Sequence, residues 1–332
     1  MSDEFPLTLC LDWKFPDVQS THDGAVVMTL SRRDLLLASS ALMLAGNIPW
    51  RSALATEGAP LTKPIPAGNE TLPVIGIGTA RRYQGASAEA LAPLREAFQR
   101  FVAQGGRVID TAPSYGDAER VVGELIASLD IRDQLFLATK VSSSGREAGV
   151  AQIERSFELL GTEMIDLIAV HNFQDTDTQL ETLRDYRDQG RVRYVGATTW
   201  VERQHDEMVA WIERGGLDFV QVDYAIDNRA AAETVLPAAE ANSVAVMVNL
   251  PFGRDRLFDK VQGQALPDWA AEIDCQSWAQ FFLKYVVSHP AVTCAIPGMA
   301  NPRYVDDNLG AAVGRMPDAG MRRRMEALID SL

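Results

Sequence analysis

The chain has 332 residues, of which 47% are hydrophobic and 23% are charged, and its formal net charge at pH 7 is −14. This length suits one large globular domain or two ordinary ones. The excess of acidic residues argues against nucleic-acid binding, which needs a clustered basic surface. Three cysteines are too few for a disulfide scaffold, and the sequence holds no apolar run long enough to predict a membrane span in the mature protein.

The first 55 residues differ from the rest and predict an export signal of the twin-arginine type. Arg32 and Arg33 precede an apolar, uncharged run from Leu35 to Gly46, and Ala53-Leu54-Ala55 supplies a cleavage pattern of small residues. A disordered tail with an accidental arginine pair is the alternative. We expect residues 1–55 to be recognised by the twin-arginine export machinery. The protein is then periplasmic, or cytoplasmic if the signal is not used.

Two further features lie on either side of the cleavage pattern. The residues before the arginine pair are acidic, whereas the first region of a signal peptide is normally positive. Met28, just before this pair, is therefore a candidate translation start besides Met1. Residues 56–69 are rich in proline and are expected to form a linker.

From residue 70 to 332, short apolar segments alternate with amphipathic ones. The apolar segments lack polar alternation, as expected of strands that are covered on both faces. They are Val74–Gly78, Val108–Asp110, Leu135–Lys140, Ile165–His171, Tyr194–Thr198, Phe219–Asp223, Ala245–Asn249 and Val292–Ile296. Glycines such as Gly161 and Gly190 follow the amphipathic segments, as expected just past a helix C-terminus. Eight strands and eight helices in this length predict an α/β fold, the (β/α)₈ TIM barrel.

A doubly wound sheet with a Rossmann dinucleotide site is the alternative fold. Its fingerprint, G-x-G-x-x-G, would follow the first strand and open a helix. Gly76 and Gly78 match its first two glycines, but Arg81 stands where the third belongs. Tyr83-Gln84-Gly85 also comes where the helix should begin. The sequence therefore favours the barrel.

Polar side chains end three of the predicted strands. Asp110, Lys140 and His171 each stand at a strand end, and Tyr115 follows the first of them closely. In a parallel barrel, the carboxyl ends of the strands converge on the face where the chemistry takes place. Each residue alone has an ordinary explanation, such as a helix cap, a loop anchor or a hydrogen-bonded core residue. The set of four, in this order, predicts an active site.

These four residues and their surroundings resemble the aldo-keto reductase family. The matching segments are Asp110 to Glu119, Lys140 with the strand before it, His171 with the strand before it, Gly196-Ala197-Thr198, and Ile296 through Asn308. The resemblance covers nearly everything after residue 70. It implies NAD(P)H-dependent reduction of a small aldehyde or ketone to the alcohol.

The chemistry of such a reduction explains why these residue types are grouped. Hydride transfer to a carbonyl leaves an alkoxide, which must receive a proton as it forms. The resemblance makes Tyr115 the general acid, and a nearby ammonium such as that of Lys140 lowers a phenol pKa from its usual value of about 10. Asp110 would hold Lys140 by a charge-assisted hydrogen bond, and His171 would orient the carbonyl oxygen.

The resemblance also implies the cofactor-binding residues. They are Gly78, Thr79, Thr198, Gln221, Pro251, Gly298, Arg303, Asp307 and Asn308. Thr199 replaces the family's usual asparagine, keeping an acceptor but losing an amide donor, and Asn249 replaces the aromatic residue that stacks on the nicotinamide. Gly298 and Tyr304 stand where many members place a phosphate-binding lysine and arginine. Arg303 is expected to substitute for them, beside a helix N-terminus near Asn301 that favours an anion. We expect NADPH, with NADH as the alternative.

Few residues of the sequence bear on the substrate contacts and on the oligomeric state. Asn172, Trp200 and Phe252 follow predicted strands and are expected to contact the carbonyl substrate. The histidines are scattered without metal-ligand spacing, so we expect no metal site and set aside a metal-dependent hydrolase. A nucleotide-bound redox sensor or binding subunit with little turnover is the alternative function, because soluble cofactor is not expected to be replenished after export. No coiled-coil seam is visible, so we expect a monomer.

Overall fold

The computed structural model describes residues 58–85 and 87–332. The predicted export signal and the alternative start at Met28 therefore lie outside the described residues. Within the described part of the chain, no helix is long and apolar enough to cross a membrane.

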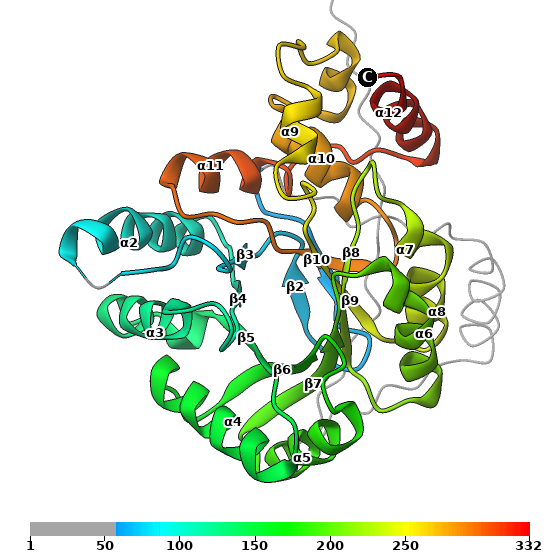
Figure 1. The fold of residues 1–332 in the computed structure, drawn as a ribbon. Coiled ribbons are helices and arrows are strands. Elements are labelled where there is room, and N and C mark those ends of the chain that lie inside the picture. The colour runs from blue at the N-terminus through cyan, green and yellow to red at the C-terminus, as the bar shows by residue number, and fades with distance from the viewer. Residues whose placement is uncertain (1–57, 86) are drawn as a thin grey trace, which may run out of the picture. The chain divides into compact units, whose positions relative to one another are not determined.

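The described unit is a barrel of eight parallel strands inside a layer of helices (Figure 1). The strands are β3 (Ile77–Gly78), β4 (Val108–Asp110), β5 (Phe136–Val141), β6 (Ile165–His171), β7 (Val192–Thr198), β8 (Phe219–Asp223), β9 (Ala245–Asn249) and β10 (Val292–Ala295). They are hydrogen-bonded to one another in chain order. The predicted (β/α)₈ fold is confirmed, with strand limits that differ from the predicted ones by a few residues.

The barrel closes between its first and last strands through glycine. The backbone nitrogens of Gly76 and Gly78 donate to Ala295 O and Pro297 O at 2.8 and 2.9 Å. A Cβ atom on Gly78 would lie only 2.6 Å from the carbonyl oxygen of Ile296. The close approach of the strands at this seam therefore requires glycine there. The first strand is shorter than predicted, because Ile75 pairs with Ala295 only as an isolated bridge.

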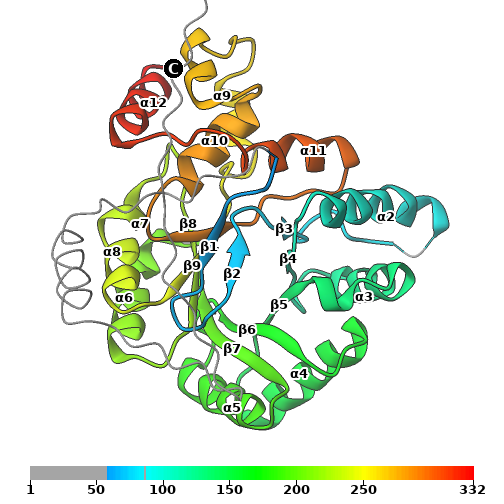
Figure 2. The ribbon, with the colours of Figure 1, turned by 180° about the vertical axis from the view of Figure 1, so that it is seen from behind.

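Helices follow the strands and cover the outside of the barrel (Figures 1 and 2). They are α2 (Ala88–Ala103), α3 (Ala118–Leu129), α4 (Arg146–Leu160), α5 (Thr176–Asp188), α6 (His205–Arg214), α7 (Ala230–Glu233), α8 (Val235–Ala241), α9 (Arg256–Lys260), α10 (Trp278–Val287), α11 (Pro302–Gly310) and α12 (Ala319–Ser331). Ser87 begins α2 by accepting from Ala90 N, and Gly161 ends α4 in a left-handed conformation.

Strand alternation divides the apolar side chains into two cores. Residues facing the inside of the barrel, among them Phe136, Leu167 and Phe219, form one core, and residues facing the helices form a larger one. Because every second residue of a strand lies on the same face, Lys140 on β5 and His171 on β6 also face inward. They stand at the carboxyl ends of these strands, above the apolar interior.

A β-hairpin packs against the interior core. It consists of β1 (Thr62–Pro64) and β2 (Thr71–Pro73), which pair in antiparallel fashion (Figure 2). Ile65 is fully buried in the interior core, and Lys63 Nζ donates to His289 O and Val292 O, both at 2.7 Å. The structure differs here from the expected linker at 56–69. Its prolines are compatible with the edge of a two-stranded sheet, so a proline-rich composition does not exclude a strand.

Candidate active site

The carboxyl ends of β4, β5 and β6 bring three of the four predicted catalytic side chains together. Lys140 Nζ lies 2.9 and 2.8 Å from the two carboxylate oxygens of Asp110 and 2.8 Å from the carbonyl oxygen of Thr111. The side chains of Lys140 and Asp110 are only 1% and 3% exposed. This buried ion pair fixes the ammonium at the carboxyl ends of the strands, which form the mouth of the barrel.

Tyr115 lies beside this ion pair and faces His171. Its ring centroid is 5.0 Å from Lys140 Nζ, and the His171 ring lies 6.1 Å away, nearly perpendicular to it at 85°. The structure therefore groups the four residues as predicted, with the phenol near both the ammonium and the imidazole. The sequence signal that carries this grouping is the position of each residue at or just after a strand end.

A glutamine that the sequence analysis missed holds the tyrosine loop. Gln84 Nε2 donates to Tyr115 O at 2.7 Å, and Gln84 Oε1 accepts from Asp117 N at 3.0 Å. Gly116 lies between them at a φ of 64°, where an added Cβ would lie 2.6 Å from Gln84 Oε1. Gln84 thus fixes the backbone on both sides of Gly116, and through it the position of the Tyr115 ring.

Charge and burial give the ammonium and the imidazole opposite properties. Burial disfavours the Lys140 ammonium, but the charge of Asp110 and the neighbouring Tyr115 phenol more than offset this, so the pKa of Lys140 lies above its usual value. Burial and the Lys140 charge lower the pKa of His171 from 6.5 to about 4. At neutral pH the site therefore combines a permanent cation with a neutral imidazole.

Two predicted cofactor residues bond to Asp110, and a third, Thr198, is buried at the end of β7. Gln221 Nε2 donates to Asp110 Oδ1 at 2.5 Å, and Thr79 Oγ1 donates to Asp110 O at 3.0 Å. Thr198 ends β7 and is 2% exposed. Gln221 and Thr79 thus support Asp110 directly, a role that the sequence analysis did not assign to them.

The remaining predicted cofactor residues follow β9 and β10. Pro251 is buried just after β9, and Gly298 is exposed just after β10. Gly298 forms an isolated bridge with Gly78, across the seam of the barrel. Asn308 is 3% exposed on α11.

The predicted substrate residues divide into two groups. Asn172 and Trp200 lie in the loops after β6 and β7, and Trp200 is 45% exposed with the Arg254 guanidinium 4.2 Å from its ring centroid. Phe252 instead packs against Phe258 and Phe282, with ring centroids 4.9 and 6.5 Å apart. Its ring is therefore held by α9 and α10, and its contact with the substrate stays a prediction.

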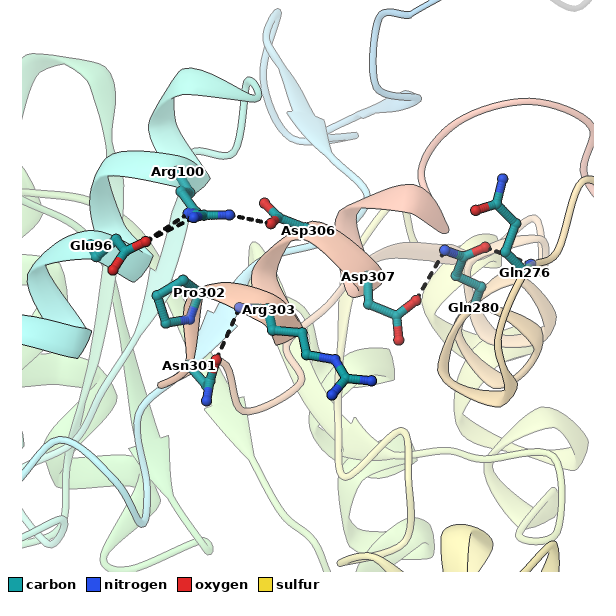
Figure 3. A pocket seen from close by; sticks show the side chains of 9 residues that line it. All are labelled: Glu96, Arg100, Gln276, Gln280, Asn301, Pro302, Arg303, Asp306 and Asp307. Atoms are coloured by element: carbon teal, nitrogen blue, oxygen red, sulfur yellow. Dashed lines mark hydrogen bonds and ion pairs between the residues drawn. The ribbon is translucent and has the colours of Figure 1, made fainter. Parts of the chain in front are cut away.

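A pocket of about 640 Å³ lies where α2, α10 and α11 meet (Figure 3). It is lined by Glu96, Arg100, Gln276, Gln280, Asn301, Pro302, Arg303, Asp306 and Asp307. Arg303 and Asp307 were predicted. The residues from α2 and α10 were missed, because the sequence does not show how these helices pack beside α11.

The two arginines of this pocket differ in whether their side chains form ion pairs. Arg100 forms ion pairs with Glu96 and Asp306 at 2.8 and 2.5 Å. Asp307 Oδ1 accepts from Ser277 Oγ at 2.7 Å. Among the described residues no ion pair involves Arg303, whose backbone nitrogen donates to the cap residue of α11. Figure 3 shows Arg303 and Asp307 reaching into the pocket from one helix.

The residues at the barrel mouth fit a polar ligand with hydrogen-bonding groups. Thr111 Oγ1, Gln221 Oε1 and Asn249 Oδ1 are buried and have no hydrogen-bond partner among the described residues. A buried polar atom without a partner costs roughly 1–3 kcal/mol, so such atoms are expected where a ligand completes the bonding. No cluster of metal-ligating side chains occurs in residues 58–85 and 87–332. The fold and the site together define a (β/α)₈ barrel with a buried ion pair and polar side chains at the carboxyl ends of its strands, and a separate polar pocket beside the start of α11.

Comparison with known proteins identifies the family. Residues 74–329 match the model of the aldo/keto reductase family. Over 254 residues, the chain is 30% identical to methylglyoxal reductase YeaE of Escherichia coli, which covers 73% of this chain and 86% of that protein. Over 261 residues, it is 28% identical to the 9,11-endoperoxide prostaglandin H2 reductase of Trypanosoma cruzi, covering 76% and 86%.

A solved structure supports the same conclusion. The aldo/keto reductase of Klebsiella pneumoniae, in complex with NADP and acetate, superposes with a TM-score of 0.67 at 26% identity, covering 78% of this chain and 92% of that one. The chain belongs to the aldo/keto reductase family. Its general chemistry is therefore NAD(P)H-dependent carbonyl reduction.

The pKa of His171 predicts how stability depends on pH. Between about pH 6.5 and 4 the unfolded chain takes up a proton at this position while the folded protein does not. Acidification through this range therefore lowers the free energy of unfolding. We expect the loss between pH 7 and pH 5, measured by urea denaturation, to be smaller in His171→Gln than in the unmodified protein. Equal losses in the two proteins would contradict the lowered pKa.

Proposed function

We propose that the chain reduces a small aldehyde or ketone to the alcohol, with Tyr115 as the proton donor and NADPH as the cofactor. The observation that carries this proposal is the buried ion pair of Lys140 and Asp110 beside the Tyr115 ring, with His171 facing the same ring. When bound, the cofactor supplies the hydride that reduces the carbonyl carbon.

The residues at the mouth donate the proton, orient the carbonyl oxygen and position the ammonium. The Lys140 ammonium stabilises the negative charge that develops on the Tyr115 oxygen as its proton passes to the forming alkoxide. Neutral His171 contributes a hydrogen bond to the carbonyl oxygen and adds no second positive charge. Asp110 holds Lys140 in place. The alcohol thus gains its carbon-bound hydrogen from the cofactor and its hydroxyl proton from Tyr115.

A reductase assay tests this function directly. The fragment 56–332 contains every residue that the structure describes, so it is suitable for purification. We expect it to consume NADPH when given nitrobenzaldehyde. Methylglyoxal belongs in the same panel, because one relative is named a methylglyoxal reductase. Nucleotide binding without turnover on a broad carbonyl panel would favour the alternative, a cofactor-bound sensor. A bound metal without nucleotide affinity would contradict both.

The preference for NADPH rests on the pocket between α2, α10 and α11. Arg100 is occupied by Glu96 and Asp306, whereas no ion pair among the described residues involves Arg303. Arg303 lies in the first turn of α11, where backbone N–H groups also favour an anion. We assign Arg303 the contact with the 2′-phosphate that distinguishes NADPH from NADH. The complex of the Klebsiella pneumoniae relative with NADP supports this choice.

Arg303→Ala should therefore weaken NADPH binding selectively. We expect the Kd for NADPH to rise about tenfold in this variant, equivalent to ~1.4 kcal/mol. The Kd for NADH should stay within about twofold of its value in the unmodified protein. Titration by protein fluorescence measures both constants. Arg323→Ala is the matched control, because Arg323 is exposed on α12 and does not line the pocket. Equal weakening for the two cofactors would contradict the assignment.

We further propose that the twin-arginine machinery exports the chain to the periplasm. The arginine pair, the apolar run and the small residues at 53–55 support this. Because this route carries folded proteins, the cofactor can be bound before export. Replacing Arg32 and Arg33 together by lysine should retain the protein in the cytoplasm, as judged by cell fractionation. An exported form that still contains Arg32 would contradict cleavage at this site.

A further inference from the structure

Two side-chain amides at the carboxyl ends of β8 and β9 have defined orientations. Gln221 Nε2 donates to Asp110 Oδ1 at 2.5 Å, and Asn249 Nδ2 donates to Thr199 O at 3.1 Å. Carboxylate and carbonyl oxygens can only accept, so each amide nitrogen must be the atom that faces them. The amide oxygens, Gln221 Oε1 and Asn249 Oδ1, therefore point elsewhere. Both are buried and lack a hydrogen-bond partner within the described part of the chain.

Strand alternation places both amides inside the barrel. Phe219 on β8 and Met247 on β9 belong to the interior core. Gln221 and Asn249 each lie two residues further along these strands and so share the same face. The register pairs Gln221 with Met247 and Asp223 with Asn249, which puts Asn249 one layer closer to the mouth. The two free oxygens thus come from neighbouring strands and successive layers.

Thr199 does not supply the acceptor that the sequence predicts at this position. Its hydroxyl donates to Gln204 Oε1 at 2.6 Å and accepts from Val201 N at 3.0 Å. Its carbonyl oxygen accepts from Asn249. Both groups of Thr199 are engaged within the protein, so Asn249 carries the free acceptor on this side of the mouth.

We propose that Asn249 Oδ1 accepts a hydrogen bond from the carboxamide NH₂ of the nicotinamide ring, next to Gln221, which the family resemblance already assigns to the cofactor. This inference rests on the proposed function and adds a cofactor-orienting residue to it. Two unpaired acceptors need a ligand that donates, and an aldehyde or ketone substrate has no N–H group. A carboxamide carries two N–H bonds on one nitrogen, which matches two oxygens from adjacent strands. Asn249 then orients the ring by a hydrogen bond where an aromatic residue would stack.

A cofactor analogue that lacks the N–H groups tests the proposal without turnover. In the acetylpyridine analogue of NADP⁺, an acetyl group replaces the carboxamide. We expect fragment 56–332 to bind NADP⁺ about tenfold more tightly than this analogue, because the analogue leaves both buried acceptors unpaired. In Asn249→Ala, which removes one acceptor, this preference should fall to about threefold or less. Isothermal titration calorimetry measures all four constants.

Two controls separate a local effect from a damaged fold. The nucleotide fragment 2′,5′-ADP lacks the nicotinamide, so it should bind Asn249→Ala and the unmodified protein equally well. Asn242→Ala is the matched asparagine control, because Asn242 lies exposed at the end of α8 and its side-chain amide donates to Ala238 O. An unchanged preference in Asn249→Ala, or no preference in the unmodified protein, would overturn the inference. Failure to bind any of the nucleotides would instead overturn the proposed function, and the inference with it.

Discussion

Tyr115→Phe should lower kcat for carbonyl reduction by about 10³-fold, within the range of roughly 10² to 10⁴ for loss of a general acid. The substitution removes only the hydroxyl, so the ring can keep its place beside Lys140 and His171. The Kd for NADPH should therefore remain unchanged. Steady-state kinetics with a small aldehyde and fluorescence titration of the cofactor measure the two quantities.

A second tyrosine provides the control for this variant. Tyr186 lies on α5, outside the barrel, and its hydroxyl donates to Glu154 Oε1 at 2.6 Å. Tyr186→Phe also removes a tyrosine hydroxyl, but on an outer helix rather than in the active site. This variant should keep kcat within about twofold of the unmodified protein's value. If Tyr115→Phe also retained most of the activity, another group would have to be the proton donor.

Lys140→Met should destabilise the protein strongly as well as abolish reduction. Both members of the ion pair are almost fully buried, so loss of the ammonium leaves the Asp110 carboxylate without its charge partner. Breaking a buried pair in this way costs about 3–5 kcal/mol. Urea denaturation at neutral pH measures the change in the free energy of unfolding.

The double variant Asp110→Asn/Lys140→Met separates the two effects. It removes both charges and therefore avoids an unpaired buried carboxylate, so much of the lost stability should return. Activity should not return, because the cation beside Tyr115 is still absent. If the double variant is as unstable as Lys140→Met alone, packing rather than charge explains the loss.

The barrel and the core of its site follow from short-range features of the sequence. Each strand is a run of apolar residues, and Asp110, Lys140 and His171 stand where such runs end. Parallel strands bring their carboxyl ends to one face, so residues far apart in sequence meet there without further information. The sequence predicts this part of the site because strand polarity alone determines it.

The remaining parts depend on packing between elements, which the local pattern does not show. Gln84 holds the loop of Tyr115, and Arg100 lines the pocket beside Arg303, yet neither lies at a strand end. The packing of the Phe252 ring against Phe258 on α9 and Phe282 on α10 is likewise not visible in the local sequence pattern. Ile65 lies among prolines that suggest a linker, but its side chain is buried in the barrel interior.

The most direct test of the central claim is a crystal structure of residues 56–332 with NADP⁺ and a carbonyl inhibitor bound. The account predicts that the nicotinamide lies at the barrel mouth, with its reactive carbon and the Tyr115 hydroxyl each about 3–3.5 Å from the carbonyl group. Lys140 and His171 should stay beside the phenol. A cofactor bound outside the mouth, or a Tyr115 hydroxyl turned away from the carbonyl, would contradict it.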